Sequence, residues 1–450
     1  MSQQNRRDFL AQGGVTVAGA AALAAPLASA RAGGANERIR LGVIGAGGRG
    51  SGVARQFAGE ADCDVTWVCD PDKTRAGKLA EALRGVRGNG APKTTADLRR
   101  VLDADNVDAL LIATPDHWHA PAAIMACEAD KHVYVEKPCS HNLREGRLLV
   151  EAARRKKRVV QHGTQSRSMR LIVDAVQMLR EGVIGDVLVA KAWNVQRRAN
   201  IGRRKPSDPP KEVDYDQWVG PAAWLPFQAN RFHYTWHWWH NFGTGDMGND
   251  GVHELDYARW GLGVTTHPSR ISGGGGKYFF DDDQEFPDTQ QVTFEYPGDG
   301  EVGQKRMLVW EMRIWSTNYP YNVDNGAEFY GTRGRMMITK RGKLEVVGER
   351  NQRIDANKAK EPRPSLLSHH VDSHHVDFLD AIRKKRTPNA DIAVGHLSAS
   401  LCHLGNIATR LGRTVMFDPQ RERVIGDEEA DALLSRNYRD GGHWGVPKGV

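Results

Sequence analysis

The stretch Ile39–Phe57, which reads IRLGVIGAGGRGSGVARQF, decides the fold. An apolar run of strand length is followed at once by a glycine-rich turn, and a helical spacing of apolar residues then begins. Within the turn, Gly45 permits the tight reversal, Gly47 lets the backbone approach a phosphate, and Gly50 lets helix and strand pack closely. The helix N-terminus offers unpaired N–H groups to an anion. The sequence therefore predicts a phosphate-binding turn made of Gly45, Gly47, Gly48, Arg49 and Gly50.

A carboxylate follows this turn at the distance expected for a dinucleotide site. The second predicted strand, Val65–Asp70, ends in Asp70, roughly 20 to 25 residues after the glycines, where an acid grips ribose hydroxyls. Because a carboxylate repels a 2′-phosphate, Asp70 favours NAD, while Lys73 and Arg75 leave NADP open. Asp70 also suits a helix N-cap, which is compatible with the first role. The two strands together predict a dinucleotide-binding domain.

Strands and helices continue to alternate after Asp70. Predicted strands cover 108–113, 133–135 and 159–161, and predicted helices cover 96–102, 120–129 and 143–156. This alternation predicts an α/β Rossmann domain, a doubly wound parallel sheet whose ligands bind at the carboxyl ends of its strands. Two polar clusters, 114–119 and 136–138, follow such ends. We therefore expect further cofactor contacts from Thr114, His119, Glu136, Lys137 and Gln165.

The chain resembles the Gfo/Idh/MocA family of oxidoreductases, which includes glucose–fructose oxidoreductase and inositol dehydrogenase. The matching segments are VIGAGGRG (43–50), ATPDHWHA (113–120), VEKP (135–138) and GNDGVHELDYARWGLG (248–263), and the likeness runs from Arg38 to about Pro419. The resemblance implies a second, α+β domain with a large open, mainly antiparallel sheet. One face of that sheet holds the substrate against the nicotinamide, and the other often builds an oligomer. We therefore expect a homo-oligomer, either a dimer or a tetramer.

The residues beyond Arg167 agree with such a second domain. Position 168–181 is predicted as a helix, and 187–195, 291–295, 306–314 and 335–338 as strands. A long polar loop is predicted at 197–213, a linker at 358–364, and amphipathic helices at 371–382 and 394–411. We expect a signal segment at 1–30, the Rossmann domain at 36–165, the substrate-binding and oligomerisation domain at 166–420, and a loosely tied tail at 421–450.

Oxidation of an alcohol by a nicotinamide needs a group that takes the hydroxyl proton as the hydride leaves. Lys137 ends a strand beside the expected nicotinamide, and it matches the EKP lysine that is catalytic in the family. The alternative interpretation is a surface lysine in a turn. His253 begins a predicted helix and matches the histidine that the family uses for substrate binding or proton transfer. Asp256, one turn later, is expected to orient His253.

Neighbouring polar and aromatic residues predict a sugar-binding pocket. Many polyol dehydrogenases of the family carry an aspartate four positions before the histidine, and Asn249 stands there instead, which argues against a simple inositol dehydrogenase. An amide still hydrogen-bonds a hydroxyl, whereas Asp250 would point elsewhere on a helical turn. The aromatic run 234–240 predicts a wall that stacks on sugar C–H faces, with core packing as the alternative. The candidate substrate-binding residues are Arg167, Trp236, Trp238, Asn249, Asp250 and His253.

Composition limits the classes of function. The 450 residues suffice for two domains, and a hydrophobic fraction of 40% is typical of a globular protein. The net charge is +7, but the basic residues are scattered along the chain, and the basic run 154–158 suits a solvated helix end. We therefore expect no nucleic-acid partner. The five cysteines form no disulfide framework. Histidines gather at 117–119, at 237–240 and at 369–375, but none of these sets has a clear third ligand at fixed spacing, so no metal is expected.

The first thirty residues resemble a twin-arginine export signal. Arg6 and Arg7 precede a weakly apolar stretch rich in alanine and glycine, and residues 28–30, Ala-Ser-Ala, form a small-residue cleavage site. A cytoplasmic protein with an N-terminal tail is the alternative. Since no later stretch is long and apolar enough to span a bilayer, we expect no stable membrane anchor. The predicted location is the periplasm or another compartment outside the cytoplasm.

Export of a dinucleotide enzyme implies tightly bound NAD, because little free cofactor is present outside the cytoplasm. The first hypothesis is an oxidoreductase that oxidises a hydroxyl of a sugar, glycoside or polyol and passes the hydride to a second carbonyl substrate. The second is a redox-neutral NAD-dependent glycosidase, which oxidises the sugar transiently, eliminates the glycosidic bond and returns the hydride. The third is a cofactor-bound sugar-binding protein without turnover. Retention of both Lys137 and His253 argues against the third.

Overall fold

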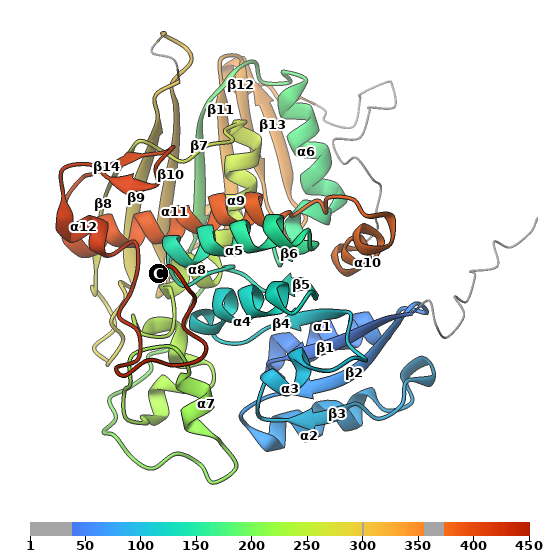
Figure 1. The fold of residues 1–450 in the computed structure, drawn as a ribbon. Helices are drawn as coiled ribbons and strands as arrows, with labels where there is room; N and C mark the ends of the chain where they lie inside the picture. Colours follow the sequence, from blue (N-terminus) through green and yellow to red (C-terminus); the bar gives the residue numbers. More distant parts are fainter. Residues whose placement is uncertain (1–37, 299–300, 355–372) are drawn as a thin grey trace, which may run out of the picture.

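The computed structural model describes residues 38–298, 301–354 and 373–450. The signal segment expected at 1–30, the linker expected at 358–364, and His369, His370 and Asp372 lie outside these ranges. Two sheets organise the chain, one in the lower half and one in the upper half of Figure 1. Within the described ranges, no helix is both long and apolar enough to cross a membrane.

The first sheet is a six-stranded parallel Rossmann sheet, as predicted. Its order is β3-β2-β1-β4-β5-β6, and the bounds are β1 (Ile39–Ile44), β2 (Cys63–Cys69), β3 (Lys93–Thr95), β4 (Ala109–Ile112), β5 (His132–Val135) and β6 (Val160–His162). Its helices are α1 (Gly48–Ala58), α2 (Lys73–Leu83), α3 (Arg99–Leu102), α4 (Asp116–Glu128) and α5 (Leu143–Lys156). The strand order reverses between β1 and β4, which is where a doubly wound sheet binds its ligands.

Local sequence explains these elements. The β4 strand is buried along its whole length because helices cover both faces of the sheet, and its residues are accordingly all apolar. Helix α5 begins after Asn142, whose side chain accepts from the Glu145 N–H, and it buries Leu149 and Ala153 on one face. Helix α2, between the first predicted helix and the one at 96–102, was not predicted. Its N-cap is Asp72, whose side chain accepts from the Thr74 and Arg75 N–H groups, so Asp70 is not a helix cap.

The second sheet has nine strands in the order β13-β12-β11-β7-β10-β9-β8-β14-β15. Neighbours run antiparallel except β7 and β10, which are parallel, so the prediction of a mainly antiparallel sheet is confirmed. The strands are β7 (Val187–Asn194), β8 (Arg270–Gly276), β9 (Thr289–Tyr296), β10 (Arg306–Arg313), β11 (Asn325–Gly331), β12 (Gly334–Ile338), β13 (Leu344–Gly348), β14 (Val415–Asp418) and β15 (Arg423–Val424).

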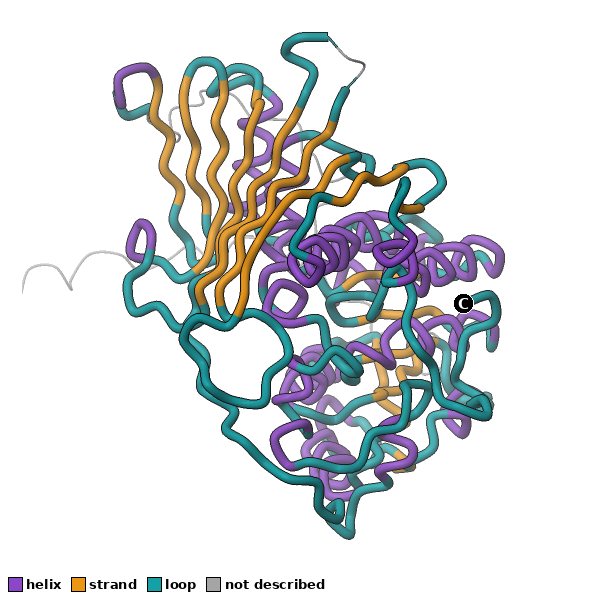
Figure 2. The backbone as a smooth tube through the Cα atoms, turned by 90° about the vertical axis from the view of Figure 1, so that its left-hand side faces the viewer, coloured by secondary structure: helices purple, strands orange, loops and turns teal. Residues whose placement is uncertain are grey.

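Helices pack on one face of this sheet, which Figure 2 shows spread across the upper left. The helices of this half are α6 (Arg170–Arg180), α8 (Gly245–Asn249), α9 (Gly251–Leu262), α11 (Ile392–Leu411) and α12 (Glu428–Ala432). Helix α10 (His374–Lys384) packs on α1 of the Rossmann domain instead. Helix α9 packs on β7 and β11, and α11 packs on both β8 and α5, so α11 joins the two halves of the molecule. The shared core includes Val252, Leu255, Phe294, Trp310 and Phe329.

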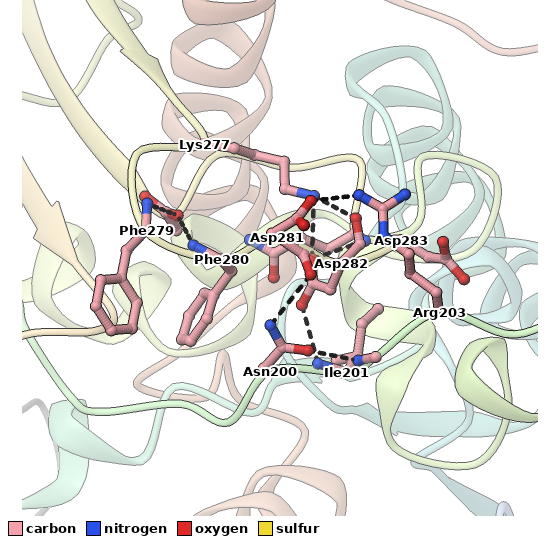
Figure 3. A network of polar contacts seen from close by, with 12 residues as sticks. Asn200, Ile201, Arg203, Lys277, Phe279, Phe280, Asp281, Asp282 and Asp283 are labelled. Carbon is pink, nitrogen blue, oxygen red and sulfur yellow. Dashed lines mark hydrogen bonds and ion pairs between the residues drawn. The ribbon is translucent and has the colours of Figure 1, made fainter.

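Between β7 and α8 the chain forms the aromatic segment, residues 195–243, which contains α7 (Tyr215–Val219). The segment has a small core of its own, with Tyr215, Trp218, Phe227, Phe232 and Trp239 among its members. Its first part is pinned to the β8–β9 connection by the polar network in Figure 3. There the Asp282 carboxylate accepts from the Ile201 N–H at 2.9 Å and from Lys277 at 3.0 Å, and Arg203 pairs with Asp281.

The end of the chain is packed more firmly than the sequence suggested. Residues 421–450 were expected to be loosely tied, but they supply β15 and α12, and they return to the Rossmann domain. Arg436 lies 2.7 Å from the buried carboxylate of Glu145, and the Trp444 ring lies 5.4 Å from that of Trp118. The expectation was wrong because the partners of this polar stretch lie about 300 positions earlier, beyond the reach of local patterns.

Candidate functional site

A cavity of about 370 Å³ lies along the carboxyl ends of β1, β2, β4 and β5. Residues of the Rossmann domain, of the aromatic segment and of α8 share its wall. The predicted residues among its lining are Gly45, Gly47, Gly48, Arg49, Asp70, Thr114, His119, Glu136, Lys137, Trp236 and Asn249. The tertiary structure thus gathers most of the predicted cofactor residues at the sheet edge where the strand order reverses, between β1 and β4.

The glycines of the turn are required by its geometry. Gly45 has a φ of +95°, and a Cβ there would lie 2.4 Å from the Ala113 carbonyl oxygen. A Cβ at Gly50 would lie 1.9 Å from the Gly45 carbonyl oxygen, so this glycine does not line the cavity but holds α1 against the turn. Helix α1 is capped by Gly47, which brings no side chain, and its first turn contains no acid. The free N–H groups of α1 therefore face the cavity as an anion site.

The end of β2 fits the ribose of a dinucleotide. Asp70 is buried, which raises its pKa, and its carboxylate accepts from the Ala46 N–H at 2.7 Å and the Asp72 N–H at 2.8 Å. These bonds fix the carboxylate beside the glycine turn and leave further lone pairs for hydroxyl groups. At the end of β4, the buried Thr114 hydroxyl has no hydrogen-bond partner among the described residues, although it lines the cavity. A buried hydroxyl of this kind indicates a missing ligand or water, and together these residues fit NAD.

Glu136 lies at the end of β5 and is hydrogen-bonded to two other predicted residues, Arg49 and Gln165. Its carboxylate accepts from Arg49 Nε at 2.7 Å and from Gln165 Nε2 at 3.2 Å. Gln165 also donates to the Tyr134 hydroxyl at 3.1 Å, and it lies outside the lining of the cavity. The structure therefore gives Gln165 a place beside Glu136 and no direct place in the cavity wall.

His119 braces two loops of the site. Its Nδ1 lies 2.6 Å from the Pro138 carbonyl oxygen, and its Nε2 lies 2.8 Å from the Thr114 carbonyl oxygen. Burial lowers the pKa of His119 to about 4, so the ring is neutral near pH 7. A neutral imidazole has a single N–H, and it donates to one of the two carbonyls at a time. His119 therefore holds the turn after β4 close to the Lys137–Pro138 turn after β5.

Lys137 and Asn249 meet at one end of the cavity. Lys137 Nζ donates to the Asn249 backbone carbonyl oxygen, and the Asn249 side-chain oxygen is 3.4 Å away. The Asn249 amide in turn donates to Asp246 at 2.9 Å, which fixes its orientation. Trp236 and His237 line the same end and stack on each other with ring centroids 3.6 Å apart. Burial and the nearby charge of Lys137 keep the pKa of His237 well below its usual value.

Four predicted substrate residues do not line the cavity. Arg167 forms a buried ion pair with Asp256 at 2.8 Å, so its guanidinium is turned to the protein interior. Asp250 pairs with Lys340 at 2.9 Å, which agrees with the expectation that it points elsewhere on the turn. Trp238 is a fully buried core residue, so the alternative of core packing holds for that ring.

His253 is the fourth of these residues. It is buried near the start of α9, and its Nδ1 has no hydrogen-bond partner in the described part of the chain. Asp256 therefore does not orient it, since that carboxylate is engaged by Arg167 and by the Ser398 hydroxyl at 2.6 Å. Burial first, and then the charges of Lys340 and Lys137, hold the pKa of His253 well below its usual value, so the ring is neutral. Its role in substrate binding or proton transfer remains a prediction.

Several lining residues were not singled out from the sequence. Asp116 follows the end of β4, is fully buried, and accepts from the Thr244 hydroxyl at 2.6 Å. Burial raises the pKa of Asp116 to about 7, with the Lys137 charge opposing the shift. The feature of the sequence that could have identified Asp116 is its position in the ATPDHWHA segment, directly after a predicted strand. Lining residues from the aromatic segment, such as Gln217, Trp218 and His233, had no signal, because they are about 80 to 120 positions from the β4 and β5 ends that they face.

One cluster outside the cavity has the composition of a metal site. His267 and His396 approach the same oxygen of Glu422, at 2.8 and 3.0 Å. The Arg147 guanidinium, however, donates to both oxygens of Glu422 and adds a positive charge where a cation would sit. These donors together hold the pKa of Glu422 well below its usual value. We therefore interpret the cluster as a hydrogen-bond network that fastens the start of the tail to α5 and α11.

Comparison with family models assigns both halves of the chain. Residues 39–164 match the model described as "Oxidoreductase family, NAD-binding Rossmann fold" of the Gfo/Idh/MocA group. Residues 186–275 and 364–444 match the corresponding "Oxidoreductase family, C-terminal alpha/beta domain". The two matches together cover more than half of the chain, and they agree with the cavity in making NAD the cofactor.

Individual relatives are more distant. A "Glycosyl hydrolase family 109 protein" from Shewanella pealeana is 29% identical over 42% of this chain and 45% of its own length. A "Glycosyl hydrolase family 109 protein 2" from Shewanella sp. strain ANA-3 is 32% identical over 43% of this chain and 46% of its own length. The chain thus matches less than half the length of these curated relatives.

Solved structures share the fold at lower identity. The WlbA dehydrogenase from Bordetella pertussis, solved with NADH and UDP-GlcNAcA, has a TM-score of 0.64 at 16% identity, covering 85% of this chain and 98% of that one. Levoglucosan dehydrogenase, solved with NADH and L-sorbose, has a TM-score of 0.62 at 18% identity, covering 84% of this chain and 99% of that one. At these identities the likeness establishes the fold.

Proposed function

We propose that this chain, which belongs to the Gfo/Idh/MocA family of NAD-binding oxidoreductases, oxidises a hydroxyl group of a sugar, glycoside or polyol and keeps its NAD tightly bound. The observation that carries the proposal is the convergence of Lys137, Asn249 and Trp236 on the cavity that also holds the glycine turn. A proton acceptor, a hydrogen-bonding amide and an aromatic face are the groups that a sugar hydroxyl and its ring require.

Lys137, Asn249 and Trp236 each have a separate role in the proposed reaction. When bound, NAD would supply the acceptor for the hydride that leaves the carbon carrying the hydroxyl. Lys137 Nζ, as the neutral amine, takes the hydroxyl proton, and the Asn249 carbonyl that it contacts holds the amine at the end of the cavity. Trp236 packs on the C–H face of the sugar, and the Asn249 amide, fixed by Asp246, hydrogen-bonds a neighbouring hydroxyl. His253 is the candidate for a second proton-transferring or substrate-binding group.

A second candidate is redox-neutral cleavage of a glycoside, which the names of the two Shewanella relatives favour. In this reaction a ring hydroxyl is oxidised to a ketone, the acidified neighbouring C–H loses its proton to a base, and the glycosidic C–O bond breaks. Water then adds to the resulting double bond and the hydride returns to the ketone. The net change is hydrolysis with no net redox change.

The first experiment is mass spectrometry of the supernatant after denaturing protein that was purified without added cofactor. Near-stoichiometric nucleotide supports tight binding and distinguishes NAD from NADP. Protein that purifies without nucleotide and works only with added NAD overturns the retention of the cofactor. The loaded enzyme is then given a panel of sugars and aryl glycosides. A keto sugar or lactone supports net oxidation, a freed aglycone without net redox change supports cleavage, and binding without turnover overturns both.

The location and the assembly state belong to the same proposal. Arg6 and Arg7 support twin-arginine export to the periplasm or another extracytoplasmic site. Fractionation of cells that express the wild type and an Arg6→Lys/Arg7→Lys double variant tests it, because only the wild type should be exported and shortened. We expect a homo-oligomer, since an open sheet with one uncovered face favours association. Light scattering coupled to size exclusion measures the assembly state.

A further inference from the structure

The nucleotide cavity has a second wall that does not come from the Rossmann domain. Gln217, Trp218 and His233 of the aromatic segment line it together with Asp70 and Arg75, the residues at the ribose end. The same segment continues to Trp236 at the Lys137 end. A dinucleotide bound along the carboxyl ends of the strands would therefore lie between the Rossmann sheet and the aromatic segment.

The aromatic segment is attached to the Rossmann domain at two places beside this cavity. Near the ribose end, the Lys73 N–H donates to the Glu212 carbonyl at 3.1 Å, and the Asp214 N–H donates to the Pro71 carbonyl at 2.9 Å. Near α4, Trp118 Nε1 donates to the Trp218 carbonyl at 3.1 Å. The segment therefore lines the cavity opposite the strand ends and is hydrogen-bonded to the Rossmann domain beside it.

The aromatic segment is organised around a core of its own. Its side chains form their own core, in which the rings of Tyr215 and Trp218 stack with centroids 5.6 Å apart. Its first part is fixed to the β8–β9 connection, where Asp283 accepts from the Arg204 N–H at 2.8 Å, close to the network of Figure 3. One end of the segment is thus anchored in the second domain, and the α7 end is the part that contacts the Rossmann domain.

The C-terminal tail lies on that α7 end. Figure 1 shows the dark red tail running from α12 past α4 to the light green segment around α7. Arg439 pairs with Asp216, its guanidinium lies 4.8 Å from the Trp224 ring, and its N–H donates to the Pro221 carbonyl at 3.1 Å. Three residues earlier, Arg436 donates to the His117 carbonyl at 2.8 Å. The tail thus bonds to the aromatic segment and to the Rossmann domain at once.

We propose that the aromatic segment closes over bound NAD as the second wall of its site, and that tail residues 436–444 fasten it there. NAD then leaves when the contacts between tail and segment open, and these contacts set the rate of release. This inference rests on the retention of NAD proposed above and adds the structural element that causes it.

The test measures nucleotide release and not turnover. Full-length protein loaded with NADH is mixed with a large excess of NAD, and the loss of bound NADH fluorescence gives the release rate. In Arg439→Ala the ion pair and the contact with Trp224 are lost, and we expect release about fivefold faster than in the wild type. Asp216→Ala removes the partner from the segment side and should accelerate release in the same direction. Arg421→Ala is the matched control, because its side chain is 84% exposed and contacts only the nearby Asp418, at the end of β14, among the ion pairs of the described residues.

The possible results distinguish the role of the tail from the retention of NAD on which it rests. Wild-type release that is complete within the mixing time overturns retention of NAD altogether. Slow wild-type release that is equally slow in Arg439→Ala and Asp216→Ala overturns the role of the tail and leaves retention standing. Thermal unfolding of each variant accompanies the release measurement, and an Asp216→Ala protein that unfolds like the wild type keeps the test valid if Arg439→Ala folds poorly.

Discussion

Gly50→Ala provides the sharpest test of the phosphate-binding turn. A Cβ at position 50 would lie 1.9 Å from the Gly45 carbonyl oxygen, and because non-bonded atoms do not approach within 3.0 Å, helix and turn must separate by about 1 Å. Overpacking of this kind costs about 1–3 kcal/mol. The displaced N–H groups of α1 also lose their alignment with the phosphate. Since about 1.4 kcal/mol corresponds to a tenfold change, we expect NAD affinity to fall about tenfold or more.

Gly52→Ala is the matched control in the same helix. An added Cβ at position 52 meets no heavy atom within 4 Å among the described residues, and the site is exposed in the interior of α1. Replacing glycine by alanine in a helix interior stabilises by about 0.5–1 kcal/mol, so this variant should unfold at a slightly higher temperature. Both variants carry one added methyl group two residues apart, and they differ in whether that methyl has room.

The assay is titration of nucleotide-stripped protein with NAD, together with thermal unfolding of the apoprotein. We expect weaker binding and a lower unfolding temperature for Gly50→Ala, and wild-type binding with a raised unfolding temperature for Gly52→Ala. If Gly50→Ala binds NAD as tightly as Gly52→Ala, the close contact between Gly45 and Gly50 does not shape the anion site, and the reasoning from its geometry is refuted.

Three further predictions concern the reaction centre and its support. Lys137→Ala should lower the turnover of sugar substrates by about 10²–10⁴-fold with the bound NAD content unchanged, whereas Lys131→Ala, which removes a lysine bonded to the Ala104 carbonyl, should leave the rate near wild type. Burial raises the pKa of Glu254 to about 8 despite its ion pair with Lys340, so the folded state binds more protons than the unfolded state between about pH 4.5 and 8, and stability falls as pH rises through this window. Denaturant titrations at pH 5.5 and pH 8 should therefore show a smaller loss of stability in Glu254→Gln than in the wild type, and an equal loss would contradict the buried, protonated carboxyl. Trp236→Leu should raise KM for the sugar about fivefold with little change in NAD affinity, and an unchanged KM would assign Trp236 to packing alone.

Local patterns were sufficient for the dinucleotide half of the protein. The strand β1, the turn and α1 follow one another within Ile39–Phe57, and helix α5 was predicted with its observed bounds because its 3.6-residue apolar period is undisturbed. Asp70, Thr114, Glu136 and Lys137 were predicted to lie together because parallel strands bring their carboxyl ends to one edge of the sheet, and the structure places all four around one cavity. Strand β8 was missed since its sequence, RISGGGG, has too few side chains to show alternation.

The interactions that complete the site were decided by the tertiary structure. Arg167 looked available from the sequence, and it is engaged by Asp256, 89 positions later in the chain, because a buried guanidinium must be paired. The second wall of the cavity arises from the aromatic segment, and the bonds that hold that segment arise from the tail about 200 positions further on. Sequence alone determined which residue types lie at the strand ends, since side-chain periodicity and turn chemistry are local. Tertiary packing determined which distant residues face these strand ends. A buried charge needs a partner and a buried ring needs close neighbours, and both can come from any part of the chain.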